Sequence, residues 1–433
     1  MIRPYGCAVD TPHLQRFAEA GVLFRKAFTV NPTCSPSRAA LVTGKWPHCN
    51  GMIGLCHRGS RLNDPNEHWV HTFKNAGYHT VQVGTQHVMP PESDRGFDDY
   101  LEEIDVEATD GDEDENTTRK AVAFIEGEHD SPFFMECGYI RTHRTEPPIE
   151  GVMWHDFERS PAGDPRYVMP PPPLPDHPET RRDWADFKEA VRQLDGMMGR
   201  VIRAVDSAGL ADETLMIVTT DHGIAFPGMK CNLTDAGIGV MLMIRGPGGF
   251  DGGNVYDAMV THMDIFPTAC EVADIDAPDR LQGYSLCPLV QGKTAKIRDE
   301  VFAEVNYHAA YEPKRAVRTE RYKYIRRYEV LDHPVLPNCD DSVTKSLYLR
   351  HGWNECLQAE DVLYDLAFDP YETCNIARNP ESAHILKRLR PKLEQWMKEK
   401  DDPLASGDRV PPWPGMKVNP TDGTSPGDPT QPA

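Results

Sequence analysis

The chain has 433 residues, 39% of them apolar and 26% charged, which is ordinary for a folded globular protein. Its 46 basic and 67 acidic residues give a net charge of 46 − 67 = −21, which argues against nucleic acid as a partner and requires any anion to bind in a local basic pocket. No run of about 18 apolar residues occurs, so no membrane span is predicted.

The N-terminus and the cysteines bear on the cellular compartment. The first ten residues, MIRPYGCAVD, lack the apolar core of a secretory signal, so the sequence as written predicts a cytoplasmic protein. The 11 cysteines stand at irregular spacings without a CxxC pair, which indicates a reducing compartment rather than a disulfide framework.

Strands alternate with helices through the first two thirds of the chain. A first helix is predicted between Thr11, its cap, and Gly21, and a long amphipathic helix runs from Trp184 to Gly209. Strands are predicted within 76–84, 131–140, 214–223 and 239–248. This order predicts an α/β fold with a large mixed, mostly parallel sheet flanked by helices on both faces.

The pattern changes after about Gly292. Residues 315–329 alternate basic with apolar or aromatic side chains, which is typical of an antiparallel strand with one wet face, and 384–400 form an amphipathic helix. We therefore predict a catalytic domain over 1–295 and a smaller antiparallel-sheet subdomain over 296–405. The remainder, 406–433, is rich in proline, glycine and aspartate and is predicted to be disordered.

Polar side chains follow three of the predicted strands. His87 follows the first of them, His143 the second, and Asp221-His222 the third. The carboxyl ends of strands are where an open α/β sheet carries its chemistry, so a carboxylate and an imidazole there suit a divalent cation. The alternatives are a plain strand-end turn for Asp221-His222 and ordinary surface or core residues for the two histidines. As functional residues, those histidines would be general acids or anion donors.

A fourth cluster is the stretch NPTCSPSRAALVTG, residues 31–44, in which Cys34 opens a short helix near Arg38. A thiol at a helix N-terminus beside a guanidinium has a lowered pKa, so Cys34 is a candidate nucleophile; a buried structural thiol is the alternative. Helix N–H groups and a guanidinium together also suit a tetrahedral oxyanion such as sulfate or phosphate.

This stretch carries a resemblance to a known family. CSPSRAALVTG resembles the C-x-P-S-R-x-x-L-x-T-G element of the sulfatases, a long and specific motif. Further similar segments are TPHLQRFAEAGVLF, 44–52, 95–100, 194–223, 261–275 and 363–381. Residues 223–248 and 317–325 are most similar to the N-sulfoglucosamine sulfohydrolase (heparan sulfamidase) branch, so the chain is identified as a member of the sulfatase family near that branch.

The resemblance implies a mechanism. In sulfatases the cysteine that matches Cys34 is oxidised to formylglycine by a formylglycine-generating enzyme, which would then be a partner of this chain. One hydroxyl of the hydrated aldehyde attacks sulfur and the other allows sulfate to be expelled. The expected activity is hydrolysis of sulfate esters or sulfamates, with a sulfated small molecule or saccharide as substrate.

The same resemblance implies roles for individual residues. Arg38 would hold the aldehyde hydrate, and His87 and His143 would contact it or protonate the leaving group. Cys34, Asp221 and His222 would bind a divalent cation, usually calcium in this family. Lys230 would bind a sulfuryl oxygen, and His308 would donate a hydrogen bond to the sugar.

The chain departs from the family pattern at two places. Sulfatases normally have an N-terminal strand that ends in two metal-binding aspartates, and no such segment precedes YGCAVDTPHL here. The usual Lys-x-His is Thr85-Gln86-His87, so one sulfate-contacting lysine is missing. A start codon recorded downstream of the true one would explain the first departure, and an upstream extension could carry a signal for a periplasmic or secreted protein.

Two other functions are compatible with the sequence. One is a phosphonate monoester hydrolase or phosphodiesterase of the same alkaline-phosphatase-like superfamily, because sulfuryl and phosphoryl groups are both tetrahedral. The other is a catalytically inactive, metal-poor remnant, which the missing aspartates would favour. The sequence does not indicate an oligomeric state.

Overall fold

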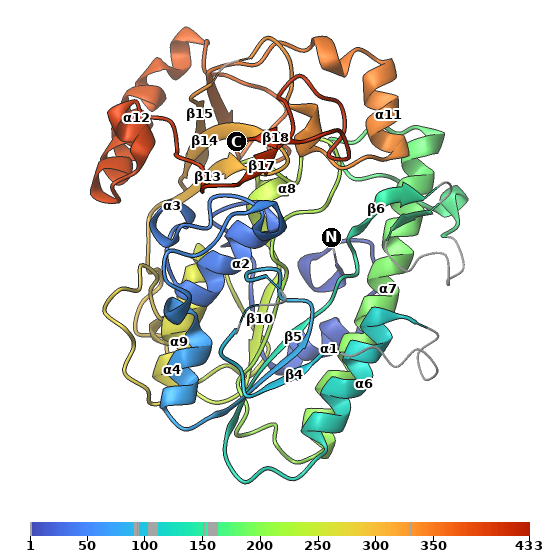
Figure 1. Ribbon diagram of the computed structural model, residues 1–433, viewed down its shortest axis with the longest axis vertical. Coiled ribbons are helices and arrows are strands. Elements are labelled where there is room, and N and C mark those ends of the chain that lie inside the picture. Colours follow the sequence, from blue (N-terminus) through green and yellow to red (C-terminus); the bar gives the residue numbers. More distant parts are fainter. Residues whose placement is uncertain are drawn as a thin grey trace.

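The structure, a computed structural model, describes residues 2–90, 93, 95–102, 111–149, 152–154, 163–329 and 331–433. It has the predicted α/β fold, with strands at its centre and helices on both sides of them (Figure 1). The helices α6 (Glu113–Ile125) and α7 (Pro178–Ser207) lie on one side, and α2 (Cys34–Thr43), α4 (Trp69–Asn75) and α9 (Ile265–Val272) lie on the other. No helix among these residues combines the length and the apolarity needed to cross a bilayer.

One part of the sheet is a parallel ladder. Its central strand β3 (His79–Gly84) pairs in parallel with β4 (Asp99–Leu101) and with β5 (Phe133–Gly138). β3 and β5 both end in glycine, and their backbones approach so closely that a Cβ on Gly84 would lie 2.3 Å from the Gly138 carbonyl oxygen. The chain segments that follow the two strands, carrying His87 and His143, therefore leave the sheet side by side.

The second part of the sheet is mixed. Its order is β11 (Asn254–Tyr256), β1 (Val22–Phe24), β10 (Leu242–Arg245), β8 (Met216–Thr219). β1 is parallel to β11, whereas β10 runs antiparallel to both of its neighbours. The prediction of a mixed sheet is confirmed, and the described strands include more antiparallel pairs than the sequence pattern indicated. A separate short sheet has the order β12 (Val260–Thr261), β2 (Ala27–Phe28), β9 (Gly239–Val240).

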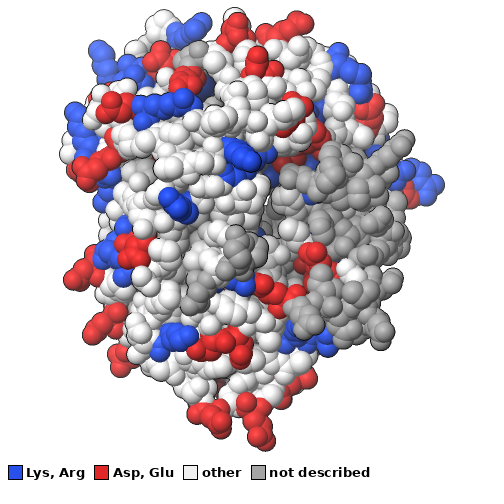
Figure 2. All heavy atoms as spheres, viewed as in Figure 1, with Lys and Arg blue, Asp and Glu red and all other residues white. Residues whose placement is uncertain are grey.

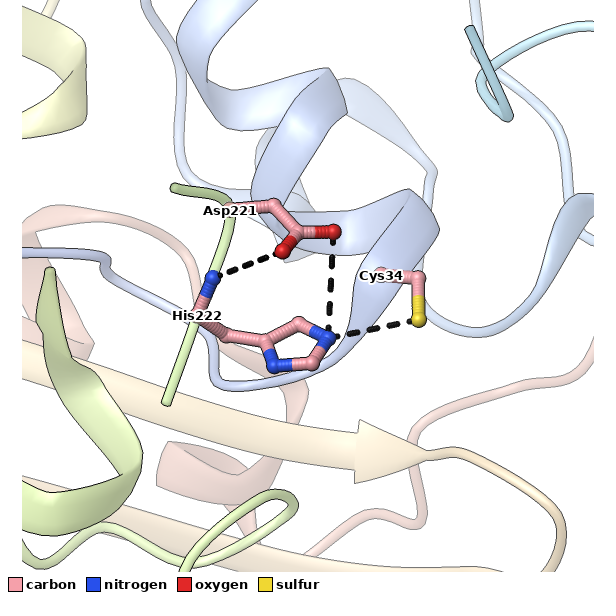
Figure 3. A group of neighbouring side chains, drawn as sticks. All are labelled: Cys34, Asp221 and His222. Carbon is pink, nitrogen blue, oxygen red and sulfur yellow. Dashed lines mark hydrogen bonds and ion pairs between the residues drawn. The ribbon is translucent and has the colours of Figure 1, made fainter. Parts of the chain in front are cut away.

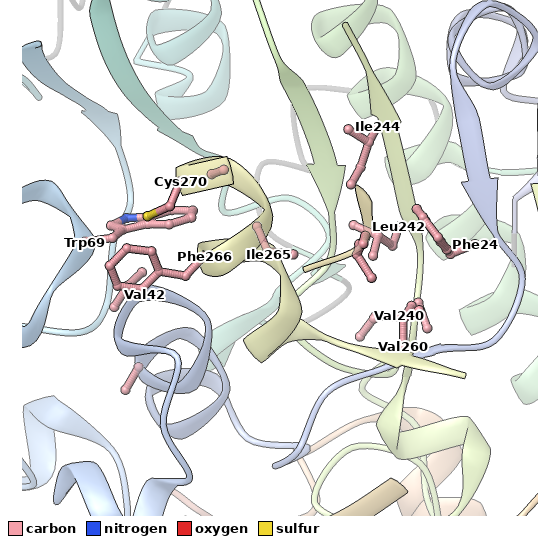
Figure 4. Packing of buried hydrophobic residues seen from close by; sticks show 14 of the residues in the cluster. Phe24, Val42, Trp69, Val240, Leu242, Ile244, Val260, Ile265, Phe266 and Cys270 are labelled. Atoms are coloured by element: carbon pink, nitrogen blue, oxygen red, sulfur yellow. The ribbon is translucent and has the colours of Figure 1, made fainter. Parts of the chain in front are cut away.

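The main hydrophobic core lies between this mixed sheet and the helices α2, α4 and α9 (Figure 4). Phe24, Leu242 and Ile244 contribute from β1 and β10, and Trp69 and Phe266 pack edge-to-face with ring centroids 6.0 Å apart. This packing fixes α2 against the sheet, and α2 is the helix that begins with Cys34.

The long helix α7 starts earlier than Trp184, where the sequence pattern placed it. His177 caps it by accepting a hydrogen bond from the Glu179 N–H, and Pro178 occupies its first turn, where the missing N–H costs nothing. Its buried side chains include Trp184, Phe187, Val191, Ile202 and Val205.

The C-terminal part is built on an antiparallel sheet, as predicted. It consists of β13 (Val301–Tyr307), β14 (Tyr311–Arg318), β15 (Tyr322–Arg327) and β16 (Asp361–Asp365) in sequence order, and α12 (Ala383–Glu399) packs on it. Trp396 of α12 stacks on Phe302 with ring centroids 5.0 Å apart and meets Trp46 at 4.9 Å. Because Trp46 belongs to the N-terminal part, the two parts share one core. Further helices of the described residues are α1 (Pro12–Ala20), α3 (Pro47–Asn50), α8 (Asp235–Ile238), α10 (Cys287–Val290) and α11 (Val343–Arg350). Strand β6 (Arg144–Ile149) pairs with β7 (Val152–Trp154).

A buried ion network also joins the two parts. His48 Nδ1 lies 2.9 Å from a Glu304 carboxylate oxygen, and Arg315 Nη2 donates to Asp402 at 3.0 Å. Burial lowers the pKa of His48, but the Glu304 charge outweighs it and raises this pKa to about 10. The acidic groups of this network are therefore balanced by the cations His48 and Arg315, and the cluster is structural.

The segment 406–433 is not a disordered tail. Val410, Met416, Val418 and Asn419 are buried, and β17 (Lys417–Val418) pairs with β18 (Gln431–Pro432). Its composition resembles that of disordered segments, but its few apolar side chains are spaced so that they anchor it onto the core.

Charge is distributed unevenly over the surface. On the face shown in Figure 2, acidic side chains gather at the lower end, whereas basic ones near the middle stand singly among uncharged residues. The described residues of this face form no continuous basic patch of the kind that nucleic acid requires.

A cavity of about 1820 Å³ runs between the two parts of the sheet. Its walls include the whole of β5 and β8, together with Met198 and Val201 of α7. Each residue of β5 is only half-buried, and among the described residues neither strand has a backbone partner on the side that faces the cavity. Two strand edges with unpaired N–H and C=O groups thus line a slot inside the molecule.

Candidate active site

Cys34 stands at the first position of α2, after an extended Thr33. Its side chain is buried, and it faces the carboxyl ends of the strands, where the slot opens into a polar chamber of the same cavity. The free N–H groups of the first helical turn surround this position, and they favour an anion there.

Asp221 and His222 follow β8 and reach Cys34 (Figure 3). His222 Nε2 lies 3.3 Å from the Cys34 sulfur and 3.8 Å from Asp221 Oδ2. His222 Nδ1 donates to the Gly223 carbonyl at 2.7 Å, so Nε2 carries the lone pair in the neutral ring and points at the other two side chains. Side chains from the end of β8 and from the start of α2 are therefore in direct contact.

The electrostatics of the site favour negative charge at position 34. Burial alone would raise the pKa of the Cys34 thiol, but the positive charges of Lys230 and His222 outweigh it and hold this pKa well below its usual value. Burial lowers the pKa of His222, but the charges of Asp221 and Cys34 outweigh it and raise this pKa to about 8.

Arg38 lies one helical turn after Cys34 and braces the site. Its Nε donates to Asp221 Oδ2 at 3.0 Å, and Nη1 lies 3.4 Å from the carbonyl oxygens of Thr85 and Gln86. Ser37, on the same turn, donates to the backbone carbonyl of Asp221. Helix α2 and the loops after β3 and β8 are thereby held together by one guanidinium and one hydroxyl.

His87 is held in a left-handed backbone conformation, with φ 57°, after β3. Its Nε2 lies 2.9 Å from His57 Nδ1, and the two rings stack with centroids 5.2 Å apart. Burial lowers the pKa of His87, but contacts with the Cys34 and Cys56 thiols outweigh it and raise this pKa to about 9. His87 is therefore positioned as a cation beside Cys34.

His143, Lys230 and His308 complete the ring of side chains around Cys34. His143 is within hydrogen-bonding reach of the thiol, and its Nδ1 lies 2.6 Å from the Arg144 carbonyl. His308 is 4% exposed, its ring lies beside the thiol, and its Nδ1 has no partner among the described residues. Lys230 is 4% exposed and acts on Cys34 through its charge. All eight residues predicted from the sequence line this one cavity: Cys34, Arg38, His87, His143, Asp221, His222, Lys230 and His308.

Sequence reasoning missed two residues of the site. Asp340, which is buried, accepts from Lys230 Nζ at 3.0 and 3.1 Å and thus fixes the direction of that ammonium group. His57, the partner of His87, lines the cavity. Asp340 lies 110 residues from Lys230, and no spacing rule connects the two. His57 stands in a short turn whose histidine has no distinguishing pattern.

The donor atoms around Cys34 decide which metal ion the described residues could hold. The side-chain donors of Cys34, Asp221 and His222 lie within 4.8 Å of one another, as a cation site requires. A calcium ion takes about six to eight oxygen ligands, whereas this group offers a single carboxylate that already accepts a hydrogen bond from Arg38. The described residues alone therefore do not fit calcium.

Comparison with known proteins agrees with this geometry. The sequence profile of the sulfatase family matches residues 3–275, and that of the C-terminal region of N-sulphoglucosamine sulphohydrolase matches residues 230–348. The chain is 30% identical to human N-sulphoglucosamine sulphohydrolase over 92% of this chain and 87% of that protein. It is 28% identical to an ulvan-active sulfatase of Formosa agariphila over 93% of this chain and 78% of that protein.

Solved structures share the fold. One, described as a complex with its substrate D-glucosamine-2-N,6-O-disulfate, superposes with a TM-score of 0.68 at 19% identity, covering 92% of this chain and 95% of that one. A phosphonate monoester hydrolase from Silicibacter pomeroyi superposes with a TM-score of 0.65 at 20% identity, covering 90% and 91%. Two findings assign the family: the sulfatase profile matches more than half of the chain, and human N-sulphoglucosamine sulphohydrolase is 30% identical to it. The chain therefore belongs to the sulfatases, a family of sulfuric ester hydrolases.

Proposed function

We propose that this protein hydrolyses a sulfate ester or a sulfamate on a saccharide, through a formylglycine made from Cys34. The observation that carries the proposal is the convergence of Arg38, Lys230 and the cavity histidines on the first residue of α2 in one cavity. The sugar is inferred from the relatives, because human N-sulphoglucosamine sulphohydrolase and the ulvan-active sulfatase are named for sulfated saccharides. Calcium is the proposed metal, by resemblance to the family.

The chain's own side chains would share the work as follows. A formylglycine hydrate at position 34 supplies the attacking hydroxyl and the second hydroxyl that permits release of sulfate. Lys230, oriented by Asp340, neutralises a sulfuryl oxygen, and Arg38 keeps Asp221 and the start of α2 in register. His143 and His87 line the cavity beside position 34, where either ring is placed to protonate the leaving oxygen or nitrogen.

Parallel assays test the reaction class. The chain, coexpressed with a formylglycine-generating enzyme, is expected to hydrolyse an aryl sulfate and glucosamine N-sulfate faster than an aryl phosphonate monoester, because its relatives with high coverage are sulfatases. The three rates are compared at equal substrate concentration in calcium-containing buffer. A faster reaction with the phosphonate would contradict the proposal and favour the phosphonate monoester hydrolase alternative.

His308 is expected to act on the sugar more than on the sulfuryl group. His308→Ala should reduce kcat/KM for a sulfated sugar by roughly 1–3 kcal/mol of transition-state stabilisation, the cost of a lost buried polar contact, and should leave a small aryl sulfate nearly unchanged. The side chain suits this role because its Nδ1 is buried and has no hydrogen-bond partner in the described part of the chain. Equal losses on both substrates would place His308 in the chemical step, and no loss on either would make it a bystander.

The small set of metal donors that the described residues offer and the slot between β5 and β8 can be explained together. The slot opens at Cys34 and Asp221, and β3, β5 and β8 all direct their carboxyl ends to that chamber. A strand parallel to them, paired with both free edges, would deliver its last side chains to the metal cluster. We propose that such a strand, ending in carboxylates, completes the sheet and the calcium site together.

A further inference from the structure

The segment 419–428, hereafter the C-terminal strap, lies against the active-site cavity. Arg58 Nη2 donates to the Pro426 carbonyl at 2.9 Å, and Arg58 Nη1 donates to Asn419 Oδ1 at 2.7 Å. The Asn419 N–H in turn donates to the Ala309 carbonyl at 2.7 Å. Since Arg58 follows His57 and Ala309 follows His308, the strap is fastened to the direct neighbours of two cavity histidines.

A second attachment joins the strap to the loop that orients Lys230. Ser425 Oγ donates to the Asp341 carboxylate, and Asp341 directly follows Asp340, which holds the Lys230 ammonium at 3.0 Å. Through Ser425 the strap is therefore attached to the short loop that orients Lys230, the proposed sulfuryl-binding cation.

The conformation of the strap is set by one carboxylate. Asp428 Oδ2 accepts the N–H groups of Thr424 at 2.8 Å and Ser425 at 2.9 Å, and the Asp428 carbonyl accepts from Asn419 Nδ2 at 2.6 Å. These bonds close a turn around Pro426. The ring of Pro426 is rigid, and the Pro426 carbonyl already accepts a hydrogen bond from Arg58. Pro426 therefore presents a rigid, uncharged surface.

Pro426 lines the cavity together with His57, Arg58, His308 and Ala309. We infer that the C-terminal strap is a specificity-determining wall of the active site, which contacts the part of the substrate beyond the sulfuryl group. The inference rests on the proposed function. Charged groups around Cys34 hold the sulfuryl group, and an uncharged, rigid surface held beside them suits the apolar face or the edge of a sugar ring.

Two aspartate substitutions within the strap test this inference. Asp428→Ala removes the acceptor that closes the turn, whereas Asp422→Ala, the matched control, removes an exposed carboxylate that makes no hydrogen bond among the described residues. Binding of glucosamine N-sulfate and of sodium sulfate to the full chain is measured by calorimetry, and thermal unfolding is recorded for each variant. Asp428→Ala is expected to weaken the binding of glucosamine N-sulfate about tenfold and the binding of sulfate less than about twofold. Asp422→Ala is expected to change neither affinity.

The outcomes separate this inference from the proposed function. If Asp428→Ala weakens the binding of both ligands equally, or of neither, the inference that the strap determines specificity is wrong. If the wild-type chain binds glucosamine N-sulfate no better than sulfate, the proposal of a saccharide substrate is contradicted. The inference about the strap is then contradicted as well, because it rests on that proposal. If Asp428→Ala fails to fold, Ser425→Ala, which removes only the bond to Asp341, is held to the same tenfold and twofold limits.

Discussion

Replacing Cys34 by serine is expected to abolish turnover and leave the fold intact. Serine is nearly isosteric with cysteine and keeps a hydroxyl that could take up the sulfuryl group, but it has no second hydroxyl to release it. The loss should exceed about a thousandfold, as for removal of a nucleophile in other hydrolases. Aryl sulfate hydrolysis, with thermal unfolding as the folding control, measures both effects. Cys374→Ser, which changes an exposed thiol, should retain full activity.

The chemical state of Cys34 provides the companion measurement. Trypsin should release residues 27–38 as one peptide, and mass spectrometry of protein from the natural host should find an aldehyde at position 34. An intact thiol in that peptide, or substantial turnover by Cys34→Ser, would contradict formylglycine chemistry.

Adding a strand before Met1 is expected to have the second large effect. A chain extended before Met1 by about six apolar, β-branched residues that end in Asp-Asp should unfold about 5–10 °C higher, because the strand pairs with the free edges of β5 and β8 and buries apolar surface in the slot. Its calcium affinity should rise at least about tenfold, because two carboxylates join Asp221, the single carboxylate that the described residues offer there.

The same extension ending in Asn-Asn is the matched control. It should raise the unfolding temperature as much and leave calcium binding unchanged, since the strand pairs equally well but adds no charge. Calorimetric calcium titration and a thermal scan of the three chains decide the matter. Tight calcium binding by the unextended chain would show that the site is already complete, and unchanged unfolding temperatures would show that the slot takes no strand.

Local patterns predicted the elements whose boundaries depend on neighbouring residues. The Thr11-Pro12 start and the Gly21 end match α1 (Pro12–Ala20), and the stretch 76–84 contains β3. The start of α7 was placed six residues late, because the pattern of apolar side chains begins at Trp184 and the capping by His177 is a weaker signal.

The segment 406–433, which contains the C-terminal strap, shows where composition misleads. Proline, glycine and aspartate favour disorder only when a segment cannot bury enough apolar surface. Here Met416 and Val418 pack on the core, and Arg58, far earlier in the chain, satisfies the strap's carbonyl and amide oxygens. These contacts join residues far apart in the sequence, so the local composition of the segment cannot predict them.

The sequence by itself determined that Cys34 begins a helix beside Arg38 and that His87, His143 and Asp221-His222 follow strands, because helix caps, turns and periodicity act over a few residues. Parallel strands then bring those ends to one edge of the sheet. Only the tertiary structure decided which groups complete the site. Three contacts between residues distant in the sequence belong to it: Lys230 with Asp340, His57 with His87, and Arg58 with Pro426. No spacing along the chain predicts these pairs. A buried charge or carbonyl group needs a hydrogen-bonding partner, because burial without one costs free energy. Which residue serves as that partner depends on what the fold places beside it.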